Sequence, residues 1–253
     1  MKAVRFMPLA ALMLLASGCA LRPPQVLRIA LVAPFEGRTR RIGYDAFPAL
    51  RIAVRNAITA DPARAVQIEF VAYNDDGDPA TAQRVAHSVA IDPQVVAVIG
   101  NLQLSTTLAA LNVYTTAGLP VLAPAVPSSQ LPDDPLLFRM GPGTQAMTAI
   151  QCVGCAVVGA PEPDALPAAV RALAKFKDVS LGAAPTADSV VAYDAAALLL
   201  AAIHDAASTG PVDRTTVAQA LQRVRFEGLT GTIHFDEHGI WPEAPAYVRS
   251  RSR

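Results

Sequence analysis

The stretch that decides the fold is "VAYNDDGDPATAQRVAHSVAIDPQVVAVIG" (71–100). It continues an apolar run predicted as a strand over 66–73, then predicts a helix over 78–91 and a second strand over 94–100. Asp78 is placed to cap the helix, and Pro79 suits its first position, where no backbone N–H is needed. A strand, a helix and a strand in this order predict parallel strands joined by a right-handed crossover.

The same alternation continues on both sides of this stretch. It predicts further strands over 27–33, 119–125, 136–140, 156–160 and 244–250, and helices over 43–60, 104–118, 164–177, 186–207 and 213–224. The segment 228–239 is predicted as a turn, a strand and a second turn. Because the helix over 186–207 is apolar on nearly every side, we expect it to be buried against the sheet. The predicted fold class is α/β, with an open parallel sheet flanked by helices.

The N-terminal residues read as a targeting segment. Lys2 and Arg5 precede an apolar run over 6–16 that is too short to span a bilayer as a permanent helix. "LASGC" (15–19) resembles the lipobox of bacterial lipoproteins, although Ala16 stands where leucine is more usual. We therefore expect a signal peptide over 1–19, lipidation of Cys19, a tether over 20–27, and an extracytoplasmic protein anchored to the cell membrane. An ordinary secretory signal with an incidental cysteine is the alternative.

Six stretches in a fixed order carry a family resemblance. They are "IALVAPFEG", the opening stretch from Val71 to Gly100, "STTLAALNVYTTAGLPVLAPA", "LFRMGPGTQAM", "VAYDAAALLLAAI" and "FEGLTGTIHFDEHG". Together they resemble the periplasmic-binding-protein type I superfamily, and within it the solute-binding lipoproteins of branched-chain amino-acid (Leu/Ile/Val) ABC transporters. The resemblance implies two α/β lobes joined by three crossovers, with a small ligand held between the lobes.

The resemblance also reveals a gap. Roughly a hundred residues, a typical small-domain size, are missing where the second lobe should be. We therefore expect the second lobe to be vestigial. The expected division is the first part of lobe one over 28–140, a shortened crossover over 141–158, the remainder of lobe one over 159–229 and a C-terminal strand segment over 230–253.

Two cysteines, Cys152 and Cys155, lie at this gap in "TAIQCVGCAVVGAPEP" (148–163). A disulfide across so short a loop would add little stability. The preceding residues do not give the strand-to-helix context of a thioredoxin-type motif, and two thiolates alone do not complete a zinc site. An inert pair, a local disulfide, an intermolecular disulfide, redox chemistry and metal binding all remain open, in that order of preference.

Ligand-binding candidates follow from the resemblance. It implies that hydroxyl and backbone N–H groups after the third and fourth strands hold the α-carboxylate of the ligand. Leu104 and Pro127 stand where the family usually has a serine and a threonine, so two contacts are weakened. The remaining candidates on these loops and on the first loop are Ser105, Thr106, Ala125, Ser128, Ser129, Arg38, Arg40 and Arg41. The alternatives are that Ser105 and Thr106 cap a helix and that the arginines form a solvated basic loop.

Other polar clusters favour structural roles. Asp75, Asp76 and Asp78 match a turn and a helix cap, and His234, Asp236 and His238 match a strand-to-turn motif. Glu36 and Asp45 are too far apart in sequence to be identified as an acid/base pair. The chain has no Ser-His-Asp order, phosphate loop or His-Glu-x-x-His helix, so we expect no catalytic residue, no metal, no cofactor and no enzymatic activity.

Three functions are consistent with the sequence. The first is a solute-binding lipoprotein of an ABC importer, with an amino acid or similar small molecule at a reduced half-site and an ABC permease as partner. The second is an interaction or regulatory lipoprotein whose exposed lobe face meets another protein, and the third is a degenerate deletion product. The formal net charge of +0 gives no electrostatic basis for binding nucleic acid.

Overall fold

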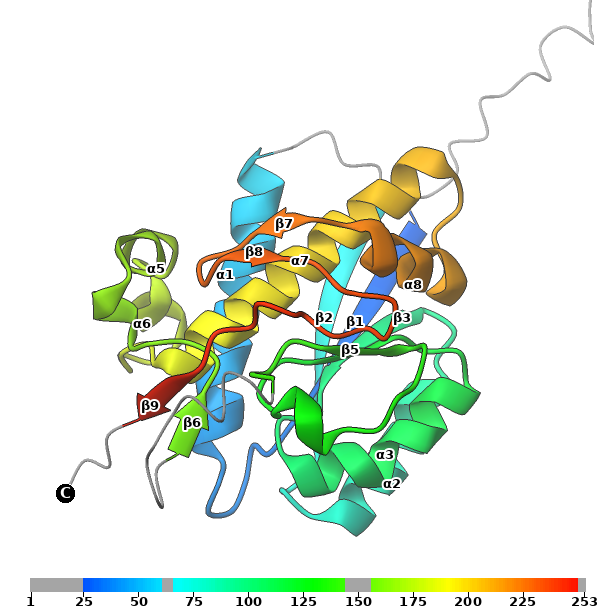
Figure 1. Ribbon diagram of the computed structural model, residues 1–253, viewed down its shortest axis with the longest axis horizontal. Helices are drawn as coiled ribbons and strands as arrows, with labels where there is room; N and C mark the ends of the chain where they lie inside the picture. Colours follow the sequence, from blue (N-terminus) through cyan, green and yellow to red (C-terminus); the bar gives the residue numbers. More distant parts are fainter. Residues whose placement is uncertain (1–24, 61–65, 144–155, 250–253) are drawn as a thin grey trace, which may run out of the picture.

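The computed structural model describes residues 25–60, 66–143 and 156–249, and it contains one parallel sheet of five strands in the order β2-β1-β3-β4-β5 (Figure 1). The strands are β1 (Gln25–Ala33), β2 (Val66–Asn74), β3 (Val95–Gly100), β4 (Val121–Ala123) and β5 (Leu137–Arg139). The predicted open parallel sheet is confirmed. The predicted signal peptide, Cys19, most of the tether, Cys152 and Cys155 lie outside the described residues.

Helices cover both faces of the sheet. One face carries α1 (Arg41–Ala60) and α7 (Ala187–Thr209), and the other carries α2 (Pro79–Ala90) and α3 (Leu104–Thr116). The side chains of β1 alternate between the two cores, with Ile29 and Leu31 facing the first and Ala30 and Val32 facing the second. A strand covered on both faces needs apolar residues at every position, which explains the continuous apolar run in the sequence.

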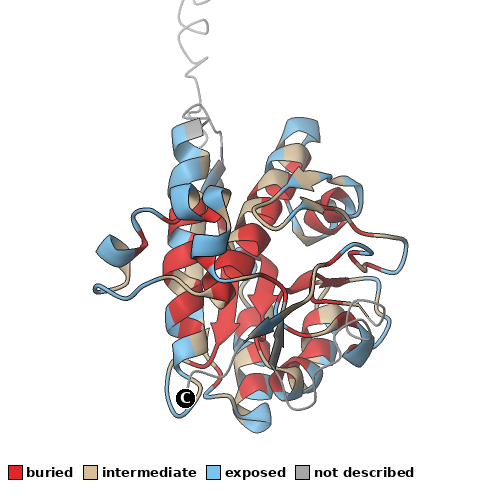
Figure 2. Cartoon of the chain, turned by 60° about the vertical axis from the view of Figure 1, so that its left-hand side comes forward, coloured by how far each residue is buried: buried red, intermediate tan, exposed pale blue. Residues whose placement is uncertain are grey.

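The predicted burial of α7 is confirmed. Val190, Leu199 and Ile203 are fully or almost fully buried, and they belong to the core shared with α1 and the sheet. Buried residues fill the middle of the molecule, while the outer helix faces are exposed (Figure 2). Length and composition alone would allow α7 to cross a membrane, but 61% of its most apolar window is packed inside the protein. It is the core helix of this lobe.

The prediction of a single helix over 164–177 is wrong. The segment is divided into a 3-10 turn η3 (Pro163–Ala165) and two short helices, α5 (Pro167–Ala172) and α6 (Phe176–Val179). Pro167 causes the first break, because a residue before proline avoids the helical region and Leu166 is extended with φ −122° and ψ 104°. Pro167 then occupies the first turn of α5, where its missing N–H costs nothing.

The C-terminal part of the chain returns to the sheet in short pieces. After α8 (Arg214–Arg223), β7 (Phe226–Glu227) pairs with β8 (Thr232–Ile233), and β9 (Tyr247–Arg249) pairs antiparallel with β6 (Ala156–Val158). Between these pairs, the backbone of Arg139 bonds to Gly239 at 2.7 Å and to Trp241 at 3.0 Å, so this segment extends the sheet beside β5. No second parallel sheet occurs within the described ranges.

One partly buried cation, Arg214, joins three elements at the amino edge of the sheet. The guanidinium of Arg214 donates to the backbone carbonyls of Val95 (3.0 Å), Ala117 (2.9 Å), Ala90 (3.0 Å) and Asp92 (2.7 Å). Two of these carbonyls lie at or just beyond the C-terminal ends of α2 and α3, where a cation is favoured by the helix dipole. Arg214 therefore fixes α8 against α2, α3 and β3 together.

One buried carboxylate fixes the turn after β7. Asp194 on α7 accepts from the N–H of Leu229 at 2.7 Å, and from the N–H and hydroxyl of Thr230 at 3.0 Å and 2.6 Å. Burial raises the pKa of Asp194 to about 6, and the hydrogen bonds from Thr230 and Leu229 oppose that rise. The turn is thus tied to the most buried helix of the protein.

Replacing Arg214 by alanine should lower the free energy of unfolding by about 2–4 kcal/mol, because four partly buried carbonyls lose charge-assisted hydrogen bonds. Urea denaturation followed by circular dichroism measures this change. Arg223→Ala is the matched control on the same helix, because Arg223 forms an exposed ion pair with Asp205 at 3.0 Å. The control should cost less than about 1 kcal/mol. Equal losses for the two variants would contradict the role assigned to Arg214.

Protein stability should fall as the pH rises from about 4 to about 6. The folded state holds the proton of Asp194 up to a pKa of about 6, above the ordinary value of 3.8, so the stabilising contribution is complete at low pH and disappears through this window. The contribution of Asp194 is at most about 3 kcal/mol. Urea denaturation at several pH values should show a smaller pH slope for Asp194→Asn than for the wild type. An unchanged slope for Asp194→Asn would contradict the assignment.

Candidate functional site

The carboxyl ends of the five parallel strands place four loops at one edge of the sheet. They are residues 34–40 after β1, 75–78 after β2, 101–103 after β3 and 124–127 after β4. β1 lies between β2 and β3, and the chain leaves β1 and β3 toward helices on opposite faces. Ligands of open α/β sheets bind in the crevice at such a switch point. The candidate site is therefore this carboxyl edge.

The first three of these loops touch one another at Gly77. A Cβ atom at Gly77 would lie 2.7 Å from Oε1 of Gln103 and 2.9 Å from Oγ1 of Thr39, and the glycine has a φ of +68°. Both the backbone conformation and the lack of space therefore require glycine at this position. Next to it, the N–H of Phe35 donates to Oδ1 of Asn74 at 2.8 Å, which fixes the first loop to the second.

The acidic residues after β2 have the structural roles expected from the sequence. Asp75 is fully buried and accepts from the N–H of Gly77 at 3.0 Å and from the amide of Asn101 at 2.8 Å. Asp78 caps α2 through the N–H of Thr81 at 2.7 Å, and this backbone hydrogen bond lowers the pKa of Asp78. No group of three potential metal ligands occurs in the part of the chain that the structure describes.

The N-terminus of α3 lies at this edge without a side-chain cap. Gln103 occupies the N-cap position in an extended conformation, and its side chain makes no capping hydrogen bond. The hydroxyl of Thr106 donates to the carbonyl of Gln103 at 3.1 Å, so it does not accept from a helix N–H, and the residue is fully buried. The prediction that Ser105 and Thr106 cap the helix is therefore wrong. Ser105 is exposed, and the N–H groups at the start of α3 have no acceptor among the described residues.

The loop after β4 and the residues that follow it form hydrogen bonds and close contacts within the protein. Ser128 is buried, its N–H donates to the carbonyl of Pro142 at 3.1 Å, and its hydroxyl lies 3.4 Å from the same oxygen. The crossover segment packs closely here, because a Cβ at Gly141 would lie 1.9 Å from the carbonyl oxygen of Val126. Ser128 thus holds the crossover in place. Ala125 and Ser129, in contrast, are exposed at the edge.

The arginines of the first loop are exposed to solvent. Arg38 and Arg40 are exposed, and the side chain of Arg41 is 77% exposed. Nε of Arg41 lies 3.4 Å from Oδ2 of Asp45, which is buried and also accepts from the hydroxyl of Thr186 at 2.9 Å. Burial raises the pKa of Asp45, and the bonds from Thr186 and Arg41 oppose that rise. Asp45 links α1 to the start of α7.

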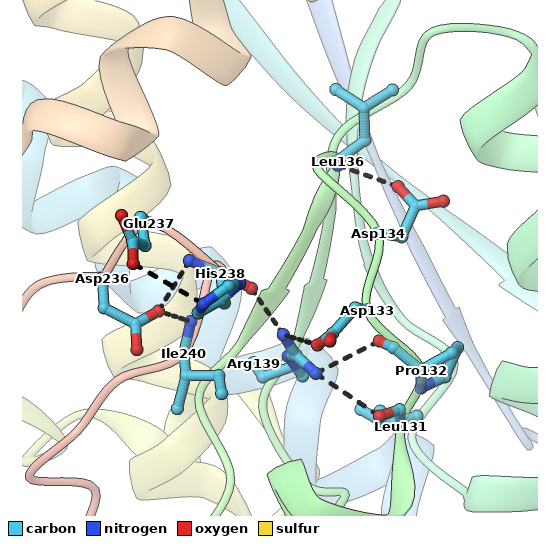
Figure 3. A network of polar contacts seen from close by, with 10 residues as sticks. All are labelled: Leu131, Pro132, Asp133, Asp134, Leu136, Arg139, Asp236, Glu237, His238 and Ile240. Atoms are coloured by element: carbon cyan, nitrogen blue, oxygen red, sulfur yellow. Dashed lines mark hydrogen bonds and ion pairs between the residues drawn. The ribbon is translucent and has the colours of Figure 1, made fainter.

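Sequence reasoning missed the buried Arg139 at the end of β5. Its guanidinium donates to Asp133, to the carbonyls of Leu131 and Pro132, and to the carbonyl of His238 (Figure 3). An arginine in a short apolar strand gives no signal of such long-range partners in the sequence. Arg139 connects the loop before β5 to the turn near the C-terminus.

The polar residues of this turn and of the segment before it bond to one another. Asp236 accepts from the backbone N–H groups of His238 at 3.0 Å and Ile240 at 2.8 Å, which closes the turn (Figure 3). Nε2 of His234 lies 3.6 Å from a carboxylate oxygen of Glu243. The structural role expected from the sequence for this cluster agrees with these contacts.

Comparisons with known proteins identify the fold. The family model described as "Periplasmic binding protein" matches residues 26–154, just over half of the chain. No curated protein sequence matches significantly. Among solved structures, the branched-chain amino-acid transporter substrate-binding protein LivJ from Streptococcus pneumoniae, in complex with isoleucine, aligns with a TM-score of 0.68 and 15% identity, spanning 88% of this chain and 95% of that chain.

Two further structures extend this comparison. The leucine-binding protein LivK from Thermotoga maritima aligns with a TM-score of 0.68 and 16% identity, over 88% of this chain and 98% of that chain. A solute-binding protein from R. palustris in complex with benzoate aligns with a TM-score of 0.65 and 11% identity, over 88% and 95%. At these identities the likeness concerns the fold. With the family match and the parallel sheet of one lobe, it follows that this chain belongs to the periplasmic binding protein family.

Proposed function

We propose that this chain is an extracytoplasmic solute-binding lipoprotein of an ABC importer of the branched-chain amino-acid type, and that it holds its ligand at a reduced half-site. The observation that carries this proposal is the uncapped N-terminus of α3 at the carboxyl edge of a periplasmic-binding-protein sheet. Structural neighbours named for isoleucine and leucine binding support the class of ligand.

The start of α3 supplies the chemistry for a carboxylate. A helix N-terminus presents unsatisfied N–H groups and the positive end of the helix dipole, and both favour an anion. Ser105 adds an exposed hydroxyl in the first turn, and the exposed Ala125 contributes backbone on the neighbouring loop. Thr106 and Ser128 are not part of this proposal, because both hydroxyls already serve backbone carbonyls.

The half-site should bind weakly. No second parallel sheet among the described residues faces this edge, so a bound ammonium group lacks the acidic partner that a second lobe would supply. Charge-assisted hydrogen bonds contribute roughly 1.5–3 kcal/mol each, and solvent weakens those that remain open to water. Losing several such contacts gives an expected dissociation constant on the order of 1 mM.

A second candidate is an interaction or regulatory lipoprotein built on one lobe, or a degenerate deletion product. Two observations favour this class: the parallel sheet is single within the described ranges, and Ser128 is committed to Pro142. Such a protein would use the carboxyl edge for a protein partner or would have lost its ligand altogether.

Ser105→Asp should weaken binding of leucine, isoleucine or valine by about tenfold or more. Aspartate in the first turn favours the helix electrostatically, so the fold is retained, but its charge repels a bound carboxylate. Ser105→Asn is the matched neutral control and should stay within about threefold of the wild type. Isothermal titration calorimetry measures both. Undetectable binding of all three amino acids to the wild type would reject the transport function and leave the second candidate, which light scattering then tests for self-association.

Lipidation of Cys19 has its own test. When the full-length chain is expressed in a bacterial host, mass spectrometry of the mature N-terminus should find a diacylglyceryl group on Cys19, and the protein should partition into detergent. Several acyl chains on one residue are needed for stable anchoring. Cys19→Ser should move the protein to the aqueous phase, whereas the control Cys152→Ser should not. Cleavage at another position, with a soluble wild-type product, would contradict the proposed anchor.

A further inference from the structure

A pocket of about 990 Å³ lies between α1 and the segment that joins α6 to α7. Its lining comes from the loop after β1, the N-terminal half of α1, Ala72 on β2 and residues 179–184. None of its lining residues belongs to the loops after β3 and β4, so the pocket is separate from the start of α3. Its volume is at the upper end of the range for small-ligand pockets.

The wall of this pocket is aromatic. The ring of Phe35 packs edge-on against Tyr44 at a centroid distance of 6.0 Å and against Phe47 at 6.3 Å, with interplanar angles of 85° and 90°. Tyr44 remains 57% exposed although it lines a largely apolar hollow. The arrangement leaves ring surface open to a further planar group, which aromatic side chains bind in edge-on or offset geometry.

Leu181 also lines this pocket, in an unfavourable backbone conformation. It is fully exposed, and its φ of 57° places it in the left-handed region that leucine rarely adopts. A hydrogen bond from the N–H of Gly182 to the carbonyl of Lys177 at 2.9 Å and one from the hydroxyl of Ser180 to Ala183 at 2.8 Å hold the turn in this form. A strained, exposed apolar side chain at a pocket is explained when a ligand packs against it.

The pocket is positively charged. Arg40, Arg41 and Arg51 line it, and neither Arg40 nor Arg51 forms an ion pair with any described residue. Asp45 is the one acidic residue in the lining, and it is buried and already bonded to Arg41 and Thr186. The charge of the lining is therefore complementary to an anion.

The neighbouring hollow along α1 extends this positive region. It is lined by Arg55, Arg171 and Lys175, and no acidic residue takes part in its lining. The chain as a whole has equal numbers of acidic and basic residues, so the basic residues along this face of α1 are a local concentration. Such a concentration raises the local density of anions and speeds their encounter with the pocket.

We propose that the pocket between α1 and residues 179–184 binds a small organic monocarboxylate with an aromatic body. Arg40 and Arg51, at two places in the lining, each offer a guanidinium that can bind a carboxylate through forked hydrogen bonds. The ring packs between the aromatic wall and Leu181. A zwitterionic amino acid fits less well, because its ammonium group would find only Asp45, whose carboxylate is already engaged. This proposal goes beyond the amino-acid half-site and does not depend on it.

The test uses ligand-observed NMR titration of the purified protein with phenylacetate. Phenylacetate should bind, and its neutral analogue phenylacetamide should bind at least tenfold more weakly. The double variant Arg40→Gln/Arg51→Gln should weaken phenylacetate binding at least fivefold. Both side chains are exposed and neither is paired with a described residue, so the fold is retained. Arg84→Gln on α2, an exposed residue on the opposite face of the sheet, is the matched control and should leave binding unchanged.

A second set of measurements distinguishes binding at this pocket from binding at the half-site. Ser105→Asp should not change phenylacetate binding, and leucine should not displace phenylacetate. The proposal is overturned by absence of binding at millimolar phenylacetate, by equal binding of phenylacetamide, or by equal effects of the Arg40/Arg51 and Arg84 variants. Loss of phenylacetate binding in Ser105→Asp would also overturn it, because the acid would then occupy the carboxyl edge. Binding of anionic vesicles that depends on Arg40 and Arg51, without binding of phenylacetate, would replace it with a membrane contact.

Discussion

The structure depends on burying α7. This helix is apolar on nearly every side, so it must be covered by the sheet on one side and by α1 and α8 on others. Its few polar side chains then form hydrogen bonds that hold segments distant in sequence. Ser189 donates to the backbone carbonyl of Asp45 at 2.9 Å, and Asp194 holds the turn after β7. Although α1 and α7 lie far apart in sequence, they complete the same core and together cover one face of the sheet.

At the carboxyl edge, too, most polar side chains form hydrogen bonds within the protein. A loop at the end of a parallel strand must satisfy its own backbone before it can serve a ligand. Here Asp75, Thr106 and Ser128 are all used within the fold, each bonded to a backbone or amide group of a neighbouring loop. What remains available includes the backbone at the start of α3 and the exposed Ser105, Ala125 and Ser129. The hydroxyl groups that can bind a ligand are therefore those that form no hydrogen bond within the fold, and the sequence alone does not identify them.

This distinction explains what could be predicted from the sequence. Rules that depend only on neighbouring residues predicted the strand–helix alternation, the cap at Asp78 and the burial of α7. Pro167 also signalled the break that the single predicted helix overlooked. Arg139 and Arg214 gave no such signal, since their partners lie up to 99 and 124 residues away. The sequence also could not assign roles to Ser105 and Thr106, because their residue types suit both a helix cap and a ligand contact.

The direction of β1 relates the proposed anchor to the proposed sites. β1 begins at Gln25 at the amino edge, only a few residues after Cys19, and runs for nine residues to the carboxyl edge. A strand of this length spans about 30 Å. An acyl group on Cys19 would therefore hold the amino edge toward the membrane and direct the loops after β1, β3 and β4 away from it. The start of α3 would then face the aqueous space, where a small solute diffuses. Phe35, Arg40 and Arg41 line the proposed anion pocket and follow the same end of β1. A small anion would therefore reach that pocket more easily than the surface of the anchoring membrane would.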